Sequence, residues 1–191
     1  MLRAQVRLSL PEWVHEFVDQ ADACVSDGDK VAFAIELSRR NIHAQTGGPF
    51  GAAVYGPDDH LVAVGVNRVL PQSTSVAHAE MMAYLLAQQG MGRARLNERA
   101  DGSHFGPYTL ATSAQPCCQC YGATIWAGID RLLIGARSED VESLTEFDEG
   151  PLPQDWIGEL GKRGIAVVRD LHRDTARAVL SEYGIHGGKR Y

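Results

Sequence analysis

The sequence predicts an α/β three-layer sandwich, with five strands in one sheet and helices on both faces. Short apolar runs of strand length alternate with amphipathic helical segments from Gly51 to Tyr183, a pattern typical of this class. The 191 residues are 45% hydrophobic and 22% charged, and they suffice for one domain with a sizeable core. Because we find no internal repeat or linker, we expect a single domain over residues 1–191.

The first third of the chain predicts two helices and a hairpin. Residues 11–23 have helical spacing, and a second helix is expected from Asp29, as its N-cap, to about Ala44. The Gly47-Gly48-Pro49 run then breaks the helix. Residues 52–55 and 60–66 are expected to be strands joined by a turn at 56–59.

The middle of the chain predicts a loop, a long helix and an irregular excursion. The loop covers residues 69–75, and the helix runs from Val76 to Gln89, capped by Thr74 or Ser75 and stopped by Gly90. Residues 91–107, which include three arginines, are expected to form a solvated surface segment.

The remaining elements complete the alternation. We expect strands at 108–111, 131–136 and 165–168, and helices at 116–128, 156–163 and 171–183. The acidic segment 139–150 is assigned to no helix or strand. A glycine-rich tail occupies residues 184–191.

Four residues in two clusters carry the chemistry. His78 and Glu80 lie at the start of one predicted helix, and Cys117 and Cys120 lie in the first turn of another. Residues three apart on a helix share a face, so both sulfurs can reach one ion. Zinc takes nitrogen and thiolate ligands, and a catalytic zinc keeps one position for water. We therefore predict zinc on His78, Cys117 and Cys120, with Glu80 moving protons.

Three other interpretations of these residues are possible. A closed structural zinc site needs a fourth protein ligand, for which Cys118 or Cys24 is available. A redox Cys-x-x-Cys also opens a helix, but it leaves His78 and Glu80 without a role. The third is a core histidine with unrelated cysteines, which the placement of both clusters at helix starts disfavours.

Charge and cysteine content bear on partners and compartment. The net charge of −6 disfavours a nucleic-acid partner, since such proteins usually present a basic surface. Three cysteines within four residues favour metal or redox chemistry in a reducing compartment over a disulfide framework. The first seven residues lack the apolar core of a signal peptide, and no apolar run is long enough to cross a bilayer. We expect a cytoplasmic protein without a membrane partner.

From about Gly47 to Ala136 the chain resembles the cytidine deaminase superfamily, since both halves of its zinc motif match residue by residue. The resemblance implies a five-stranded mixed sheet of the cytidine deaminase-like kind. It also implies zinc at His78, Cys117 and Cys120, and Glu80 as the proton shuttle.

Within that superfamily the chain is most similar to the guanine deaminase branch. The similarity rests on residues 47–52, on Asn67, on residues 120–123 followed by Trp126, and on Phe147-Asp148-Glu149. It implies that Asn67 binds the purine and that a second acid assists proton transfer. That acid is expected to be Glu149 or Asp148, and Glu146 stays open. The branch also implies a homodimer whose tail closes over an active site.

Further residues are expected at the ligand. Small residues after the Gly-Gly-Pro run would let backbone groups approach a flat ring, so we expect Phe50, Gly51, Ala52 and Ala53 to orient the base. Tyr191, at the end of the flexible tail, suits the closing segment.

These residues predict hydrolytic deamination of a small-molecule nucleobase, namely guanine to xanthine and ammonia. The loop 71–75 and the long segment 91–107 depart from the branch, and both are expected to flank the pocket. An amino-triazine such as ammeline, or a pyrimidine base or nucleoside, is therefore the alternative substrate. A tRNA adenosine deaminase and a zinc-stabilised binding module without turnover are less favoured.

Overall fold

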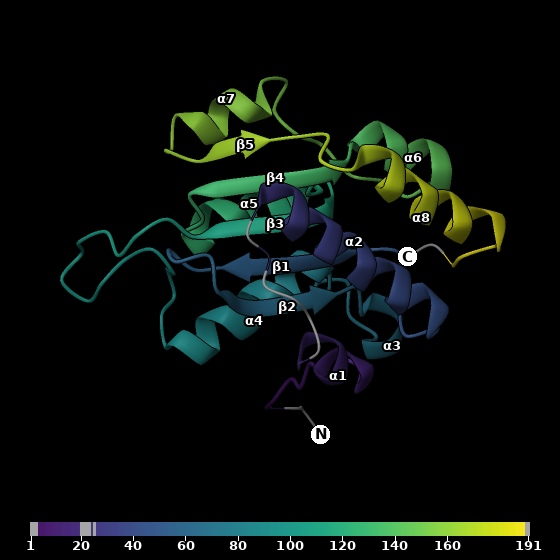
Figure 1. Ribbon diagram of the computed structural model, residues 1–191, viewed down its shortest axis with the longest axis horizontal. Coiled ribbons are helices and arrows are strands. Elements are labelled where there is room, and N and C mark those ends of the chain that lie inside the picture. The colour runs from purple at the N-terminus through teal and green to yellow at the C-terminus, as the bar shows by residue number, and fades with distance from the viewer. Residues whose placement is uncertain (1–3, 20–23, 25, 190–191) are drawn as a thin grey trace.

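Five short strands form one mixed sheet at the centre of the protein (Figure 1). The computed structural model describes residues 4–19, 24 and 26–189. The strand order is β2-β1-β3-β4-β5. β1 is antiparallel to β2 and β3, whereas β3, β4 and β5 are parallel. The strands are β1 (Gly51–Tyr55), β2 (Leu61–Val66), β3 (Thr109–Ala114), β4 (Arg131–Ala136) and β5 (Ala166–Val168).

Helices cover both faces of this sheet, which confirms the predicted three layers. One face carries α1 (Trp13–Asp19), α2 (Asp27–His43), α6 (Ser138–Thr145) and α8 (Arg173–Ile185). The other carries α4 (Ala79–Met91) and α5 (Cys118–Ala127), with α7 (Trp156–Gly161) beside β5. The short helix α3 (Val69–Gln72) precedes α4. None of the helices described is both long and apolar enough to traverse a lipid bilayer.

The alternation of side chains along the central strand divides the core in two. All five residues of β1 are buried. Ala53 and Tyr55 pack with the α2 side, whereas Ala52 and Val54 pack with the α4 side. A strand buried on both faces needs helices above and below it, which is why a sandwich forms.

Two helix starts and one helix end differ from the predictions. The N-cap of α2 is Ser26, and Asp29 lies at the third helical position, where its carboxylate accepts from the Ser26 N–H in a capping box. Neither Thr74 nor Ser75 caps α4, because residues 69–72 form α3 and the chain turns before His78, which is the N-cap. The helix ends at Gly92 in the left-handed conformation, two residues beyond Gly90.

β3 is longer than predicted. It runs to Ala114, because Thr112 pairs with Ala52 on one side and with Ile134 on the other. This extension brings Gln115 and Pro116 to the edge of the sheet where α5 begins.

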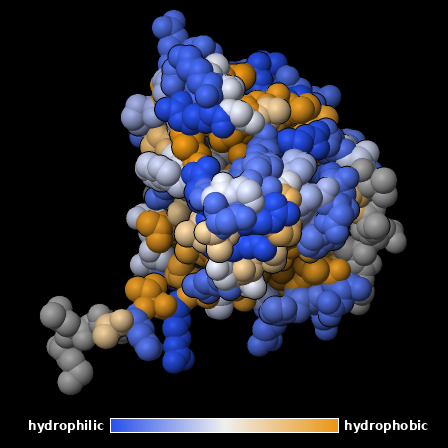
Figure 2. All heavy atoms as spheres, turned by 90° about the vertical axis from the view of Figure 1, so that its left-hand side faces the viewer, coloured by the Kyte–Doolittle hydropathy of each residue, from blue (hydrophilic) through white to orange (hydrophobic). Residues whose placement is uncertain are grey.

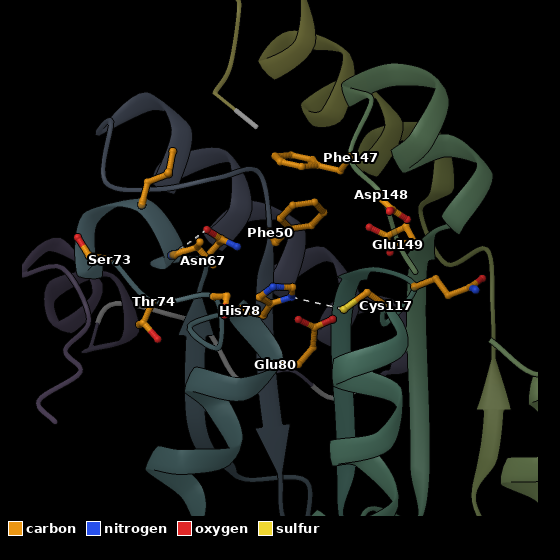
Figure 3. A pocket seen from close by; sticks show the side chains of 14 residues that line it. Phe50, Asn67, Ser73, Thr74, His78, Glu80, Cys117, Phe147, Asp148 and Glu149 are labelled. Atoms are coloured by element: carbon orange, nitrogen blue, oxygen red, sulfur yellow. Dashed lines mark hydrogen bonds between the residues drawn. The ribbon is translucent and has the colours of Figure 1, made fainter. Parts of the chain in front are cut away.

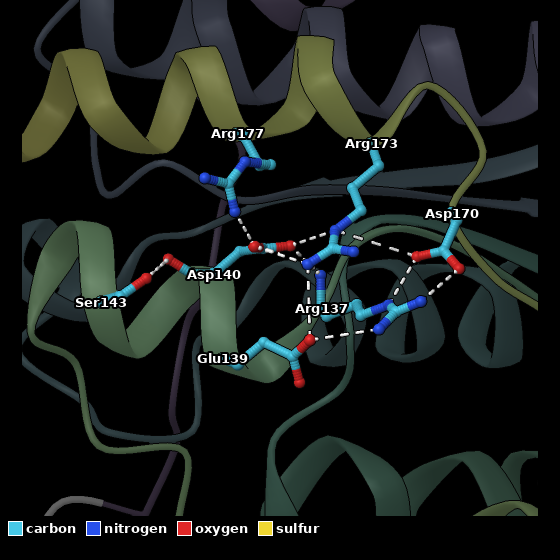
Figure 4. Close-up of polar contacts among 7 residues, drawn as sticks. All are labelled: Arg137, Glu139, Asp140, Ser143, Asp170, Arg173 and Arg177. Carbon is cyan, nitrogen blue, oxygen red and sulfur yellow. Dashed lines mark hydrogen bonds and ion pairs between the residues drawn. The ribbon is translucent and has the colours of Figure 1, made fainter.

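The acidic segment contains a helix, α6, that the sequence analysis did not predict. Its Asp140 side chain is 1% exposed and accepts hydrogen bonds from Arg173 Nε at 2.7 Å and the Arg137 backbone N–H at 2.9 Å; it also pairs with Arg177 (Figure 4). Burial opposes ionisation of Asp140, but these donors outweigh it and hold its pKa at about 2. The network fastens α6 to α8.

Residues 91–107 form the expected irregular segment, with an isolated bridge between Glu98 and His104. The guanidinium groups of Arg93 and Arg99 lie 4.2 Å and 4.8 Å from the centre of the Phe105 ring. Figure 2 shows the end of the molecule that carries this segment, where hydrophilic side chains alternate with small apolar patches. Because the segment follows the C-terminus of α4, it lies at the opposite end of that helix from His78. The expectation that it flanks the site at His78 is therefore wrong.

Candidate active site

The starts of two helices meet on one side of the sheet (Figure 3). His78 is the N-cap of α4 and Cys117 is the N-cap of α5, both with extended backbone. The His78 Nδ1 atom lies 3.5 Å from the Cys117 sulfur and 3.6 Å from the Cys120 sulfur. One donor atom from each of the three residues lies within 4.8 Å of the others. The structure thus brings the three predicted metal ligands together.

The three neighbouring cysteines at the start of α5 differ in the direction of their side chains and in their exposure to solvent. Cys117 and Cys120 flank the first turn on one face, whereas Cys118 is exposed. Within the described part of the chain, the metal-competent group contains His78, Cys117 and Cys120 and no fourth Cys or His. This arrangement favours three protein ligands and a position for water over a closed structural site.

The donor set fits zinc. One imidazole nitrogen and two sulfurs are ligands that zinc prefers, and two thiolates would balance its charge. The hydrogen bond from the Cys120 thiol, together with His78, holds the pKa of Cys117 at about 4 despite its burial, while the pKa of Cys120 is raised. The lowered pKa of Cys117 favours the thiolate form that a metal ion binds, and binding of the metal would displace the proton from Cys120.

Glu80 lies at the second position of α4, below the three ligands. It is 7% exposed, and its Oε2 atom lies 3.4 Å from the Cys120 sulfur. Burial, with a contribution from the Cys117 charge, raises the pKa of Glu80 to about 7. A carboxyl group with this pKa can both accept and return a proton near neutral pH.

A cavity of about 430 Å³ opens above these residues, which is in the size range of small-molecule sites. One of its walls is aromatic, since Phe50 and Phe147 both line the cavity and their rings pack against each other, 5.6 Å apart at 54°. Such rings offer flat apolar surface to a planar ligand.

A second buried carboxyl group, Glu149, reaches the cavity. Burial, followed by the charges of Cys117 and Glu80, raises its pKa to about 9. Asp148 also lines the cavity but is exposed, and its Oδ1 atom accepts from the Gly150 N–H at 2.8 Å. Glu146 is exposed at the end of α6 and does not line the cavity.

Asn67 is fully buried and lines the cavity beside His78. Its Oδ1 atom faces the backbone N–H groups of Gly48 at 3.4 Å and Val69 at 3.3 Å. These contacts fix the orientation of the amide, with its nitrogen toward the cavity (Figure 3).

Of the other predicted ligand contacts, some line the cavity and some do not. Phe50 lines the cavity, but Gly51, Ala52 and Ala53 are buried in β1 and do not. Gly51 instead approaches α2, where a Cβ atom would lie 2.7 Å from the Ser38 backbone nitrogen. Tyr191 lies outside the described residues.

Ser73, Thr74 and Ser75 line the cavity, as expected for the loop 71–75 that was linked to substrate choice. Three other lining residues were not predicted: Gln115, at the end of β3, and Val69 and Leu70, on α3. The position of Gln115 next to Pro116-Cys117 could have identified it. Val69 and Leu70 carry no local signal, because α3 itself was not predicted.

The sequence was compared with known families and proteins. Residues 26–136 match the cytidine and deoxycytidylate deaminase zinc-binding region. The chain is 32% identical to a guanine deaminase of Bacillus subtilis over 107 residues, which are 56% of this chain and 62% of that protein. It is 33% identical to a probable cytosine deaminase of Schizosaccharomyces pombe over 118 residues, or 62% of this chain and 65% of that one. The matches span just under two thirds of these two relatives.

Solved structures match over nearly the whole chain. A guanine deaminase from Nitrosomonas europaea is 40% identical, with a TM-score of 0.86, over 97% of this chain and 99% of that one. Structures of the protein NE0047 hold 8-azaguanine at 41% identity and 2,6-diaminopurine at 42%, each with a TM-score of 0.86. They cover 95% and 97% of this chain, and 98% and 95% of theirs.

Proposed function

The chain belongs to the cytidine and deoxycytidylate deaminase family, and on that premise we propose that it hydrolyses guanine to xanthine and ammonia. The observation that carries the choice of a purine is Glu149, a second buried carboxyl group across an aromatic-walled cavity from Glu80. A second acid at the site is what the resemblance to the guanine deaminase branch implies. The similar structures that hold purines support the same choice.

His78, Cys117 and Cys120 would hold the zinc ion of this family. When bound, zinc activates water for nucleophilic attack near neutral pH. Glu80 takes a proton from the attacking water and passes it to the ring nitrogen next to C2. Its burial in the first turn of α4 keeps this proton transfer away from bulk solvent.

Glu149 completes the proton transfers. With its pKa raised to about 9, it is protonated near neutral pH and can donate to the exocyclic amino group. The bond from C2 to the amine nitrogen then breaks and ammonia leaves. The oxygen from water stays on the ring as a carbonyl oxygen of xanthine, and its remaining proton passes to Glu149, which restores the acid. Asp148 is the alternative donor, but its exposure offers less control of its proton.

The purine would lie against the aromatic wall that Phe50 and Phe147 form together. Asn67 then presents its amide to the ring edge, and the two phenylalanine rings offer apolar surface to the purine. Gly51, Ala52 and Ala53 would act only indirectly, by fixing the strand from which Phe50 projects.

A pyrimidine or amino-triazine substrate is the second candidate, which the similarity to a probable cytosine deaminase favours. Ammonia release from zinc-loaded protein should be measured with guanine, ammeline, cytosine, cytidine and adenosine. Guanine should give the highest kcat/KM. Turnover of cytosine or ammeline without guanine turnover would overturn the choice of substrate, and no turnover of any base would favour a binding module.

We also propose a homodimer. Trp126, on α5, is 72% exposed and Val76, just before α4, is 43% exposed, so apolar surface lies on the helices that carry the metal ligands. Burying such side chains stabilises an interface. Sedimentation velocity should give twice the mass of one chain, and a Trp126→Glu variant should sediment as a monomer.

The tail is proposed to close the cavity; since α8 extends to Ile185, the tail begins at His186 and not at Gly184 as predicted. The described part of the tail folds back, so that the Tyr183 hydroxyl donates to the Lys189 carbonyl at 2.8 Å. The Tyr183 ring in turn stacks on Phe147 at 6.0 Å. The tail is thus fastened to a residue that contacts the cavity wall.

A further inference from the structure

Cys118, the exposed cysteine between the two metal-ligand cysteines, contacts the segment that carries Glu149. The Cys118 backbone N–H donates to the Glu149 carbonyl at 3.0 Å. Cys118 is the first residue of α5, so its N–H has no partner inside the helix. The carbonyl of Glu149 therefore satisfies an otherwise orphan donor of the metal-binding helix.

Gly150 brings the two segments into close contact. Its φ is +67°, a conformation that glycine adopts without steric cost. A Cβ atom at this position would lie 2.5 Å from the Cys118 sulfur and 3.3 Å from the Cys118 Cβ. At the first of these distances the Cys118 side chain must rotate or the backbone around Gly150 must shift, and the second distance leaves a tight contact with the Cys118 Cβ atom even after rotation.

We propose that Cys118 and Gly150 are positioning residues that fix Glu149 relative to the metal-binding helix. The inference rests on the proposed function, because it concerns the acid of that same site. Since Cys118 follows Cys117 directly, one short stretch of backbone sets both the metal ligand and the position of Glu149. A displacement of about 1 Å in such an acid can cost roughly a hundredfold in rate.

The test substitutes Gly150→Ala and uses Gly92→Ala as the matched control. Gly92 has a φ of +63°, and a Cβ atom there would meet nothing within 4 Å, so the control carries the backbone strain without the contact. It also lies at the far end of α4 from His78. We expect Gly150→Ala to lower kcat on guanine at least tenfold, with zinc content unchanged, and Gly92→Ala to leave kcat unchanged.

A second variant isolates the contact itself. Adding Cys118→Ala to Gly150→Ala removes the sulfur that the new methyl group would strike, so it should restore kcat at least threefold. The Co²⁺-substituted proteins should share one absorption spectrum, since the metal ligands are untouched. An unaltered kcat in Gly150→Ala, or no recovery in the double variant, would overturn the inference.

Amide hydrogen exchange tests the anchor without activity. In the wild-type protein the Cys118 amide should be protected, and Gly150→Ala should accelerate its exchange whereas Gly92→Ala should not. An unprotected Cys118 amide in the wild type would overturn the inference even if Gly150→Ala does not fold. If the wild-type protein does not deaminate guanine, the proposed function fails, and this exchange experiment still decides the anchor.

Discussion

The His78 Nδ1 atom lies 3.5 Å from the Cys117 sulfur, although 39 residues separate them in the chain. The contact exists because each residue is the N-cap of a helix that packs on the same face of the sheet. An N-cap residue has extended backbone, so its side chain is not confined to the helix surface. Two such ends, with Cys120 one turn further, make a three-ligand site.

The first prediction concerns the metal. Cys117→Ser should abolish stoichiometric zinc binding, because a serine hydroxyl does not replace a thiolate ligand. Cys118→Ser is the matched control one residue away, and it should retain zinc because its side chain is exposed. Metal analysis of the purified variants measures both. Equal zinc contents would contradict the ligand assignment.

The second prediction identifies the second acid. Glu149→Gln should lower kcat by about 10²- to 10⁴-fold, the usual contribution of a general acid. Asp148→Asn should have a much smaller effect, because this side chain is exposed and accepts a hydrogen bond from the Gly150 backbone N–H. Glu146→Gln, outside the cavity, is the control. A larger loss in Asp148→Asn than in Glu149→Gln would reverse the assignment.

The third prediction concerns the network that fastens α6 to α8. The pKa of Asp140 is about 2 in the folded protein and 3.8 in the unfolded chain, where the side chain has no partners. Its carboxylate therefore stabilises the fold above pH 3.8. That stability, about 2 kcal/mol, is lost as the pH falls through about 2. The difference in free energy of unfolding between wild type and Asp140→Asn should therefore be largest near neutral pH and shrink in acid.

Glu139→Gln is the control for this network. Glu139 pairs with Arg137 and Arg173, but its side chain is 66% exposed, so its loss should change stability by less than about 1 kcal/mol. Denaturant unfolding at several pH values measures both variants. A pH-independent difference for Asp140→Asn would show that its charge is not the stabilising feature.

The fourth prediction concerns the tail. Tyr183→Phe removes the hydrogen bond to the Lys189 carbonyl but keeps the ring against Phe147. If the tail closes the cavity, kcat should fall several-fold, while stability changes by no more than about 1.5 kcal/mol. Deletion of residues 187–191 should have at least the same effect. Wild-type kinetics in both variants would exclude a role for the tail.

The sequence was sufficient to predict the sheet, its strands and the metal ligands, because hydrophobic periodicity and the spacing of Cys117 and Cys120 are local. The sequence did not predict α6. The Asp140 side chain of this helix is buried because it pairs with Arg173 and Arg177, which lie 33 and 37 residues further along the chain. The sequence analysis placed Gly51 at the ligand, whereas this glycine accommodates α2. Such assignments depend on contacts between distant segments, which neither composition nor spacing encodes.

The central claim is hydrolysis of guanine with Glu80 as the proton carrier. The most direct measurement is mass spectrometry of the product after incubation of zinc-loaded protein with guanine in H₂¹⁸O. Wild-type protein should form xanthine with one ¹⁸O atom and one equivalent of ammonia, and Glu80→Gln should keep its zinc but form almost none. Unchanged guanine with the wild-type protein, or full activity in Glu80→Gln, would contradict the account.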